Sequence, residues 1–87
     1  MGSENQLAEL HVIARSPFHV YYEGSAEVLS AENPVGQFDI LPGHADFFSV
    51  LNPGKVVIST KGKPVSFTIA TGILTVRDNQ VFLFADM

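Results

Sequence analysis

Residues 55–70 read KVVISTKGKPVSFTIA, and the alternation of side chains in this stretch decides the fold class. Every second residue is apolar, whereas the residues between are mostly polar; the apolar members are Val56, Ile58, Val65, Phe67 and Ile69. A repeat of two residues is that of a β-strand with one buried and one solvated face. Lys61, Gly62 and Lys63 separate the two halves, so the stretch predicts two antiparallel strands joined at a hairpin tip.

The same repeat recurs along the rest of the chain. Alternate apolar residues share one side of the strand in Leu7–Arg15 and in Phe18–Glu23. The run Val81–Phe84 differs, because it is apolar on both sides. Turn-forming residues separate the runs about every 8–12 residues, which is the spacing of an all-β sandwich or barrel. The turn segments are Glu23-Gly24-Ser25, Pro42-Gly43, Pro53-Gly54 and Arg77-Asp78-Asn79. We therefore expect an all-β fold with type II turns at the two Pro-Gly pairs and no amphipathic helix.

Length and composition are those of one globular domain. The chain has 87 residues, of which 46% are hydrophobic and 16% charged, and this is too apolar for a disordered protein. We expect residues 7–87 to form the domain and residues 1–6 to be a disordered N-terminus or a remnant of cloning.

No apolar run approaches the roughly 18 residues that span a bilayer. The net charge of −4, with five lysines and arginines in all, argues against nucleic acid as a partner.

The sequence offers no convincing catalytic, cofactor or metal site. His44 precedes Asp46 by two residues, and Ser16 or Ser49 could complete a Ser-His-Asp triad, the hydrolytic set of a serine hydrolase. However, no serine sits in the Gly-flanked turn that carries the nucleophile in such enzymes. The three histidines share no tight ligand spacing, and there is no glycine-rich phosphate loop. We therefore predict no catalytic residue, no cofactor and no metal, and a small hydrolase built on His44 and Asp46 stays as an alternative.

Two features point to a protein partner instead. Phe47 and Phe48 are adjacent, so in an extended segment they face opposite ways, and one can be core while the other anchors a partner. Phe82 and Phe84 belong to the run that is apolar on both sides, and such a strand is either covered on both faces or needs a partner. Phe48, Phe82 and Phe84 are therefore the predicted apolar interface.

A longer pattern runs in one register from residue 10 to residue 86. It comprises LHVIARSP (10–17), YEG (22–24), GQFDILPGHA (36–45), LNPG (51–54), GILTV (72–76), NQV (79–81) and AD (85–86). The ordered set resembles the N-terminal domain of the epsilon subunit of rotary F-type ATP synthases, which is called delta in mitochondria. The most specific part is ILPGHA at residues 40–45, with Leu51, Pro53 and Gly54 behind it.

The resemblance implies a sandwich of two antiparallel sheets with roughly five strands each, and no enzymatic activity of its own. It also implies a place in the central rotor, where the domain couples the gamma subunit to the membrane c-ring during ion-driven ATP synthesis. Ser16 and His44 match positions that face gamma, and Gln37 and Gly43 match the c-ring side. The complex would lie on the cytoplasmic face of a bacterial inner membrane, or its organellar equivalent, and the chain would meet the membrane only through it.

Two departures limit what the resemblance implies. The c-ring position is often acidic in the family and is Gln37 here, so a charge pair with the ring is not expected. Many members continue into an inhibitory helical hairpin, but this chain stops at Met87, where the hairpin would begin, either as a naturally short form or as part of a longer protein. In either case this chain should not carry the inhibition of ATP hydrolysis that depends on the hairpin. A free-standing β-sandwich interaction module unrelated to ATP synthase stays as the alternative function.

Overall fold

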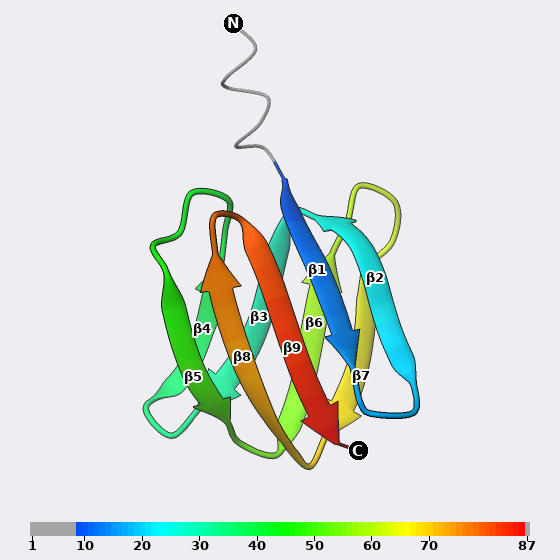
Figure 1. Cartoon of the computed structure of the whole chain (residues 1–87), viewed down its shortest axis with the longest axis vertical. Coiled ribbons are helices and arrows are strands. Elements are labelled where there is room, and N and C mark those ends of the chain that lie inside the picture. Colours follow the sequence, from blue (N-terminus) through cyan, green and yellow to red (C-terminus); the bar gives the residue numbers. More distant parts are fainter. Residues whose placement is uncertain (1–8, 87) are drawn as a thin grey trace, which may run out of the picture.

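The computed structural model describes residues 9–86, which form two stacked β-sheets (Figure 1). These residues contain nine strands and no helix. The strands are β1 (Leu10–Arg15), β2 (Val20–Ala26), β3 (Val28–Asn33), β4 (Gly36–Ile40), β5 (Phe47–Leu51), β6 (Gly54–Ser59), β7 (Val65–Ile69), β8 (Thr71–Arg77) and β9 (Gln80–Asp86). Residues 1–8 and residue 87 lie outside the described part, and with them the predicted domain boundary between residues 6 and 7.

The two sheets differ in size. One has five strands in the order β2-β1-β9-β8-β5, and the other has four in the order β4-β3-β6-β7. β6 and β7 form the hairpin predicted for residues 55–70. Neighbouring strands pair antiparallel except β1 and β9, which run parallel. The all-β sandwich is thus confirmed, with nine strands in place of roughly ten. One pair can be parallel because the whole chain between β1 and β9 connects them, whereas a tight hairpin joins only antiparallel strands.

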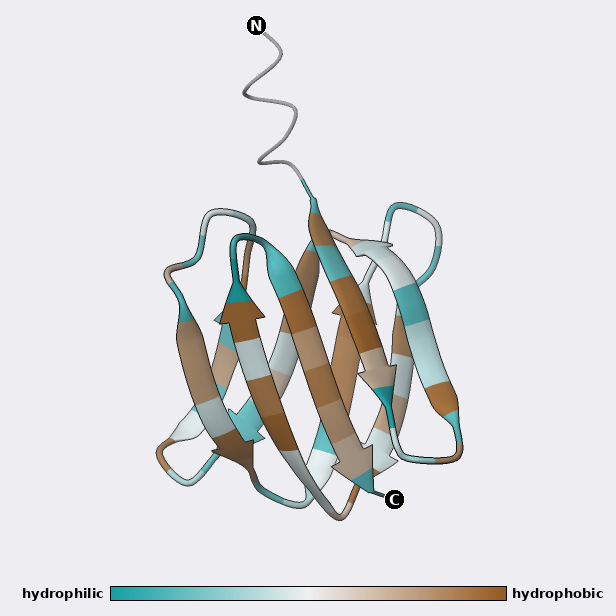
Figure 2. Cartoon of the chain, in the orientation of Figure 1, coloured by the Kyte–Doolittle hydropathy of each residue, from teal (hydrophilic) through white to brown (hydrophobic). Residues whose placement is uncertain are grey.

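The core lies between the sheets and follows the predicted alternation. In β8 and β9 buried and exposed residues alternate without a break. Figure 2 shows β9 brown along most of its length, so the outward residues of this strand are apolar as well as the inward ones. The largest fully buried side chains include Leu10, Leu29, Ile40, Ile58, Leu74 and Leu83. Because both sheets turn apolar side chains inward, the fold is held by one shared core, at roughly 25 cal/mol per Å² of apolar surface buried.

The pairing of β1 with β2 contains a β-bulge that the sequence did not reveal. Ala14 pairs with Tyr22 and Arg15 with Val20, so Tyr21 is an extra residue in β2. Adjacent residues of a regular strand point to opposite faces, but here Tyr21 and Tyr22 both pack against the core. The bulge therefore adds a second aromatic ring to the edge of the core.

Two of the predicted turns are confirmed. Gly43 has a φ of 85°, and the N–H of His44 donates to Leu41 O at 3.1 Å, as expected for a type II turn. Asp78 and Asn79 have φ values of 51° and 63° and close the hairpin between β8 and β9, as in a type I′ turn. These two turns lie at the same end of the sandwich, since the Gly43 N–H donates to Asn79 Oδ1 at 2.8 Å.

Other local predictions are wrong. Gly54 has a φ of 157° and begins β6, which does not match the φ near +80° of a type II turn. The predicted turn at residues 23–25 lies inside β2 (Val20–Ala26). The predicted strand at residues 18–23 starts too early, because Phe18 belongs to the loop before β2 and is exposed.

Candidate functional site

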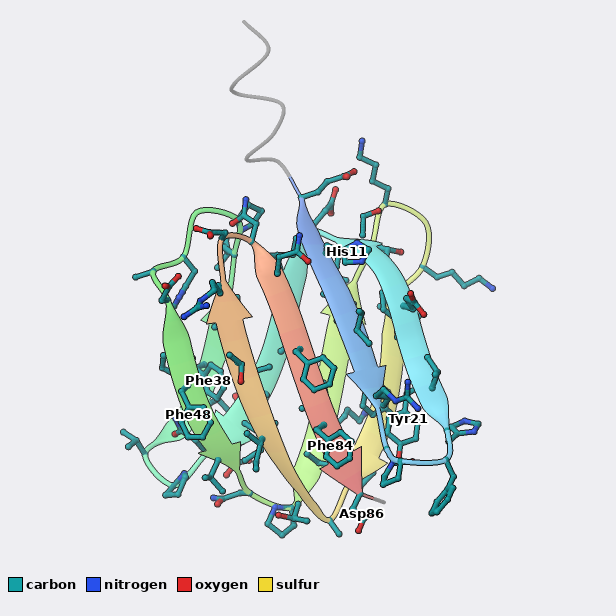
Figure 3. All side chains as sticks on the ribbon, viewed as in Figure 1. His11, Tyr21, Phe38, Phe48, Phe84 and Asp86 are labelled. Carbon is teal, nitrogen blue, oxygen red and sulfur yellow. The ribbon has the colours of Figure 1, made fainter. Side chains whose placement is uncertain are left out.

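The outer face of the five-stranded sheet carries a patch of exposed apolar side chains. We call this patch the apolar face; it consists of Phe48, Val50, Ile73, Phe82 and Phe84. Its members form two rows across β5, β8 and β9. In one row Phe48 and Phe82 flank Thr75, and the other three members form the second row. Phe48 on β5 and Phe84 on β9 can be located in Figure 3.

The apolar face is comparable in area to the largest apolar patch of a typical monomeric protein. Its members, in chain order, have exposed fractions of 65%, 53%, 45%, 45% and 40%. A fully exposed phenylalanine side chain presents roughly 200 Å², so the exposed area of the five residues is roughly 450 Å². The largest apolar patch of a monomeric protein is typically about 300–600 Å² and is often functional. Phe82 and Phe84 also stack, with ring centroids 6.4 Å apart and 17° between the rings. The apolar face is therefore a candidate protein-binding surface.

The structure brings together the three residues predicted as an apolar interface. Phe48, Phe82 and Phe84 all belong to the apolar face. Val50 and Ile73 were not among the predicted interface residues. The spacing within each strand places both on the outer face. Val50 lies two residues after Phe48 in β5 and so points the same way, and Ile73 precedes the fully buried Leu74 in β8 and so points the opposite way.

The outer face of the four-stranded sheet is mostly polar. Its polar residues include Ser30, Glu32, Gln37, Asp39, Lys55, Ser66 and Thr68. Ser30 Oγ donates to Asp39 Oδ1 at 2.7 Å across β3 and β4. Gln37, which is predicted to face the c-ring, is exposed on this sheet and stands opposite Glu32. The two outer faces of the sandwich therefore differ in chemistry.

The two residues predicted to face gamma lie at opposite ends of the sandwich (Figure 1). Ser16 directly follows β1, whose last residue pairs with Phe84 near the end of β9. His44 lies in the loop between β4 and β5, next to Gly43, which is hydrogen-bonded to Asn79 just before β9 begins. One partner reaches both residues only if it spans β9, whose seven residues extend over roughly 24 Å.

The two residues predicted for the c-ring side are also separated. Gln37 is the second residue of β4, whereas Gly43 lies in the turn beyond the other end of β4. Gln37 points to solvent from the polar outer face, and Gly43 faces the β8–β9 hairpin through its N–H. The structure therefore does not bring Gln37 and Gly43 together. The c-ring as partner of these two residues, and gamma as partner of Ser16 and His44, stay predictions.

Ser16 and His44 both make contacts within the chain. Ser16 is buried, and its N–H donates to His19 O at 2.8 Å. His44 is half-buried; its Nδ1 lies 2.8 Å from Ala45 O, and its ring meets Phe47 edge-on with centroids 5.5 Å apart. These contacts fix the loops at the two ends of the five-stranded sheet.

The residues of the alternative hydrolytic set are engaged elsewhere. Ser16 lies at the end of the sandwich opposite to His44, and Ser49 Oγ accepts a hydrogen bond from Asn33 at 3.2 Å. Nδ1 of His44 faces the carbonyl of the next residue rather than Asp46.

Within residues 9–86, no three His, Cys, Asp or Glu side chains are grouped so that they could hold a metal ion. The same residues include no helix of the length and hydropathy that a membrane crossing requires.

Two solved assemblies contain chains with this fold. A chain of the Euglena gracilis mitochondrial ATP synthase, solved as OSCP, F1 and c-ring, superimposes with a TM-score of 0.84 at 18% identity, over 92% of this chain and 52% of that one. A chain of the Tetrahymena thermophila mitochondrial ATP synthase, solved as central stalk and c-ring, superimposes with a TM-score of 0.77 at 20% identity, over 90% of this chain and 63% of that one. At these identities the likeness concerns the fold alone.

Sequence comparison identifies the family. The family described as ATP synthase, delta/epsilon chain, β-sandwich domain matches residues 9–87. An ATP synthase epsilon chain of Xylella fastidiosa is 39% identical over 66 residues, which are 75% of this chain and 47% of that protein. One of Clostridium novyi is 32% identical over 72 residues, 82% of this chain and 55% of that protein. The chain thus spans about half the length of the curated relatives it matches. It belongs to the family of β-sandwich domains found in ATP synthase delta and epsilon chains.

Proposed function

We propose that this chain is a non-catalytic subunit of the central stalk of a rotary F-type ATP synthase, and that it couples the gamma subunit to the membrane c-ring. Membership in the delta/epsilon family supports this proposal, and the relatives named above are epsilon chains. The observation that carries it is the apolar face. One outer face of the sandwich carries this patch of five exposed apolar side chains, whereas the exposed residues of the other outer face are polar, as expected for a subunit that is covered on one side by a partner.

The apolar face sets the scale of the binding energy. Burying roughly 450 Å² contributes about 11 kcal/mol at 25 cal/mol per Å². Association costs on the order of 4–15 kcal/mol in lost freedom and side-chain ordering. The five side chains therefore roughly offset the cost of association, and tight binding to gamma requires further contacts around them. Polar groups at the rim would set the orientation of the partner more than its affinity.

The predicted polar contacts constrain how two partners would share the surface. Ser16 is buried in the isolated chain, but it lines a depression together with Phe84 at the margin of the apolar face, so a partner that enters this depression would reach it. Gly43 and His44 are adjacent, so assigning one to the c-ring and the other to gamma places the boundary between the partners at this turn. Gln37 is neutral and exposed on the polar outer face, where it would meet the c-ring by hydrogen bonds and not by an ion pair.

The chain would then be a peripheral subunit that the complex holds at the membrane. In a bacterium it would lie on the cytoplasmic face of the inner membrane, and in an organelle at the equivalent position. Its net charge of −4 agrees with attachment through protein partners, because an anionic bilayer surface repels an acidic protein. No cofactor enters this role.

The test uses two matched positions on the two outer faces. Thr75 lies exposed in the middle of the apolar face, and Thr68 is exposed on the outer face of the four-stranded sheet. A photo-crosslinking amino acid is placed at one position or the other, and each protein is irradiated with purified gamma. We expect a gamma crosslink from position 75 and none from position 68. Equal crosslinking from both positions contradicts the role of the apolar face. If gamma does not bind at micromolar concentration, a free-standing interaction module is favoured instead.

A further inference from the structure

A depression of ≈ 370 Å³ lies at one end of the apolar face, where the β1–β2 loop meets β8 and β9. We call it the end pocket. Its lining includes the apolar residues Phe18, Ile73 and Phe84 and the polar residues Ser16, Thr71 and Asp86. Ile73 and Phe84 are also members of the apolar face, so the two surfaces are continuous.

Phe18 has the highest exposed fraction of the large apolar residues in the described chain, at 97%. Hydrogen bonds nonetheless order the loop that carries it. Ser16 N–H donates to His19 O at 2.8 Å, Ser16 Oγ accepts from Phe18 N–H at 3.4 Å, and Arg15 Nε donates to Ser16 O at 3.1 Å. Pro17 fixes one more backbone angle. The backbone of the loop is therefore ordered next to the end pocket, and the Phe18 ring that it carries is almost fully exposed.

The end pocket has the size and chemistry to accept one large apolar side chain. Its volume lies at the lower end of the range of ligand pockets, which is roughly 300–1,000 Å³. Of the residues that line it, only Asp86 is charged. A polar group placed against the hydrocarbon wall would lose hydration and gain few hydrogen bonds, so an apolar occupant is favoured.

We propose that the end pocket anchors the partner that covers the apolar face. One leucine, methionine or aromatic side chain of that partner enters the pocket and packs against Phe18. This inference rests on the proposed function, in which the partner is gamma. Because the surfaces are continuous, a partner that lies on Ile73 and Phe84 passes directly over the pocket. Because the backbone of the loop is ordered before binding, the conformational entropy lost on binding is mainly that of the Phe18 and anchor side chains.

Phe18 would then be one of the residues on which binding depends most. Aromatic side chains that close on a partner in a desolvated pocket commonly dominate the energy of an interface. The test compares Phe18→Ala with Val35→Ala in the whole chain. Val35 is 95% exposed and follows a proline, and its N–H donates to Asn33 Oδ1 at 2.9 Å, but Val35 does not line the end pocket. Affinity for purified gamma is measured by isothermal titration calorimetry. Phe18→Ala is expected to weaken binding on the order of 30-fold, and Val35→Ala less than about twofold.

A second pair of variants fills the pocket instead of opening it. Thr71→Trp places a bulky ring at the rim, and Thr68→Trp places the same ring on the polar outer face. Thr71→Trp is expected to weaken gamma binding by about tenfold or more, and Thr68→Trp by less than about twofold. Circular dichroism checks that each variant keeps the β-sheet spectrum and melting temperature of the parent chain.

The outcomes separate the anchor from the proposed function. If the parent chain binds gamma and Phe18→Ala binds as well as Val35→Ala, the anchor is refuted while the proposed function stands. If the parent chain does not bind gamma, the proposed function fails and the anchor fails with it. A selective loss in Phe18→Ala and Thr71→Trp supports both.

Discussion

Replacing Phe48 by threonine tests whether the apolar face binds gamma. Phe48 is 65% exposed, lies on the edge strand β5 and stands opposite Thr75 on β8. Threonine keeps a high β-propensity and can form a cross-strand hydrogen bond with Thr75, so the change perturbs the sheet little. If a partner covers the exposed part of the ring, about 130 Å² of its roughly 200 Å² contributes to binding.

The expected magnitude follows from this area. After allowance for the threonine methyl group, the substitution removes roughly 100 Å² of apolar contact, which is worth about 2.5 kcal/mol. The Kd for gamma should therefore rise by about 70-fold. The free energy of unfolding of the isolated chain should fall by less than about 2 kcal/mol, because only a third of the ring is buried without a partner.

The assay is biolayer interferometry on immobilised gamma, with urea denaturation of each variant in parallel. The control is Val57→Thr, which replaces a half-buried apolar residue between Ser30 and Ser66 on the outer face of the four-stranded sheet. Its Kd should stay within about twofold of the parent value. An unchanged Kd for Phe48→Thr, or the same loss in both variants, would refute the reasoning that the apolar face is the binding surface.

Three further predictions concern the fold and are measured by urea denaturation. Leu83→Ala should lower the free energy of unfolding by about 2–5 kcal/mol, since Leu83 is fully buried; a loss below about 1 kcal/mol would contradict its place in the core. Tyr21→Phe should lower the free energy of unfolding by about 1 kcal/mol, because it removes the hydrogen bond that the Tyr21 hydroxyl donates to Ala85 O. An unchanged free energy of unfolding would show that the hydroxyl does not hold the bulge. Asn79→Ala should lower the free energy of unfolding by about 1–2 kcal/mol. The substitution removes a residue type that tolerates a φ of 63°, and it removes the side-chain oxygen that accepts from Gly43 N–H. Asn79→Gly should recover part of that loss, and no recovery would rule out the backbone contribution.

The fold could be predicted from the sequence where pairing is local. The β6–β7 hairpin and the turn at Asp78 and Asn79 follow from neighbouring residues, because turn chemistry and a repeat of two are local properties. The bulge at Tyr21 could not be predicted, since its contacts with Ala85 and Phe67 join residues that are distant in sequence. The parallel pair of β1 and β9 likewise joins the first and last strands of the described chain.

The candidate site could be predicted only in part, for the same reason. Phe82 and Phe84 could be predicted to share a face, because they lie two residues apart in one strand. That Phe48 lies in one row with Phe82 depends on how β5 pairs with β8 and β8 with β9, which no local pattern determines. The family resemblance assigned Ser16 and His44 to one partner without a distance between them, and the structure separates them by the length of β9.

The same alternation that builds the core also builds the candidate interface. The inward residues Leu74 and Leu83 are fully buried, whereas the outward Ile73 and Phe84 stay exposed on the same two strands. β9 lies between β1 and β8 in the centre of its sheet, so a partner can cover its outer side without pairing to an edge strand. A domain of this size buries only roughly 60–65% of its unfolded surface. A partner on the apolar face would therefore act as an additional layer of the core and stabilise the folded chain by mass action. Folding depends on the inward side of β8 and β9 and the proposed binding on their outward side, so substitutions on the outward side should weaken binding while the isolated domain stays folded.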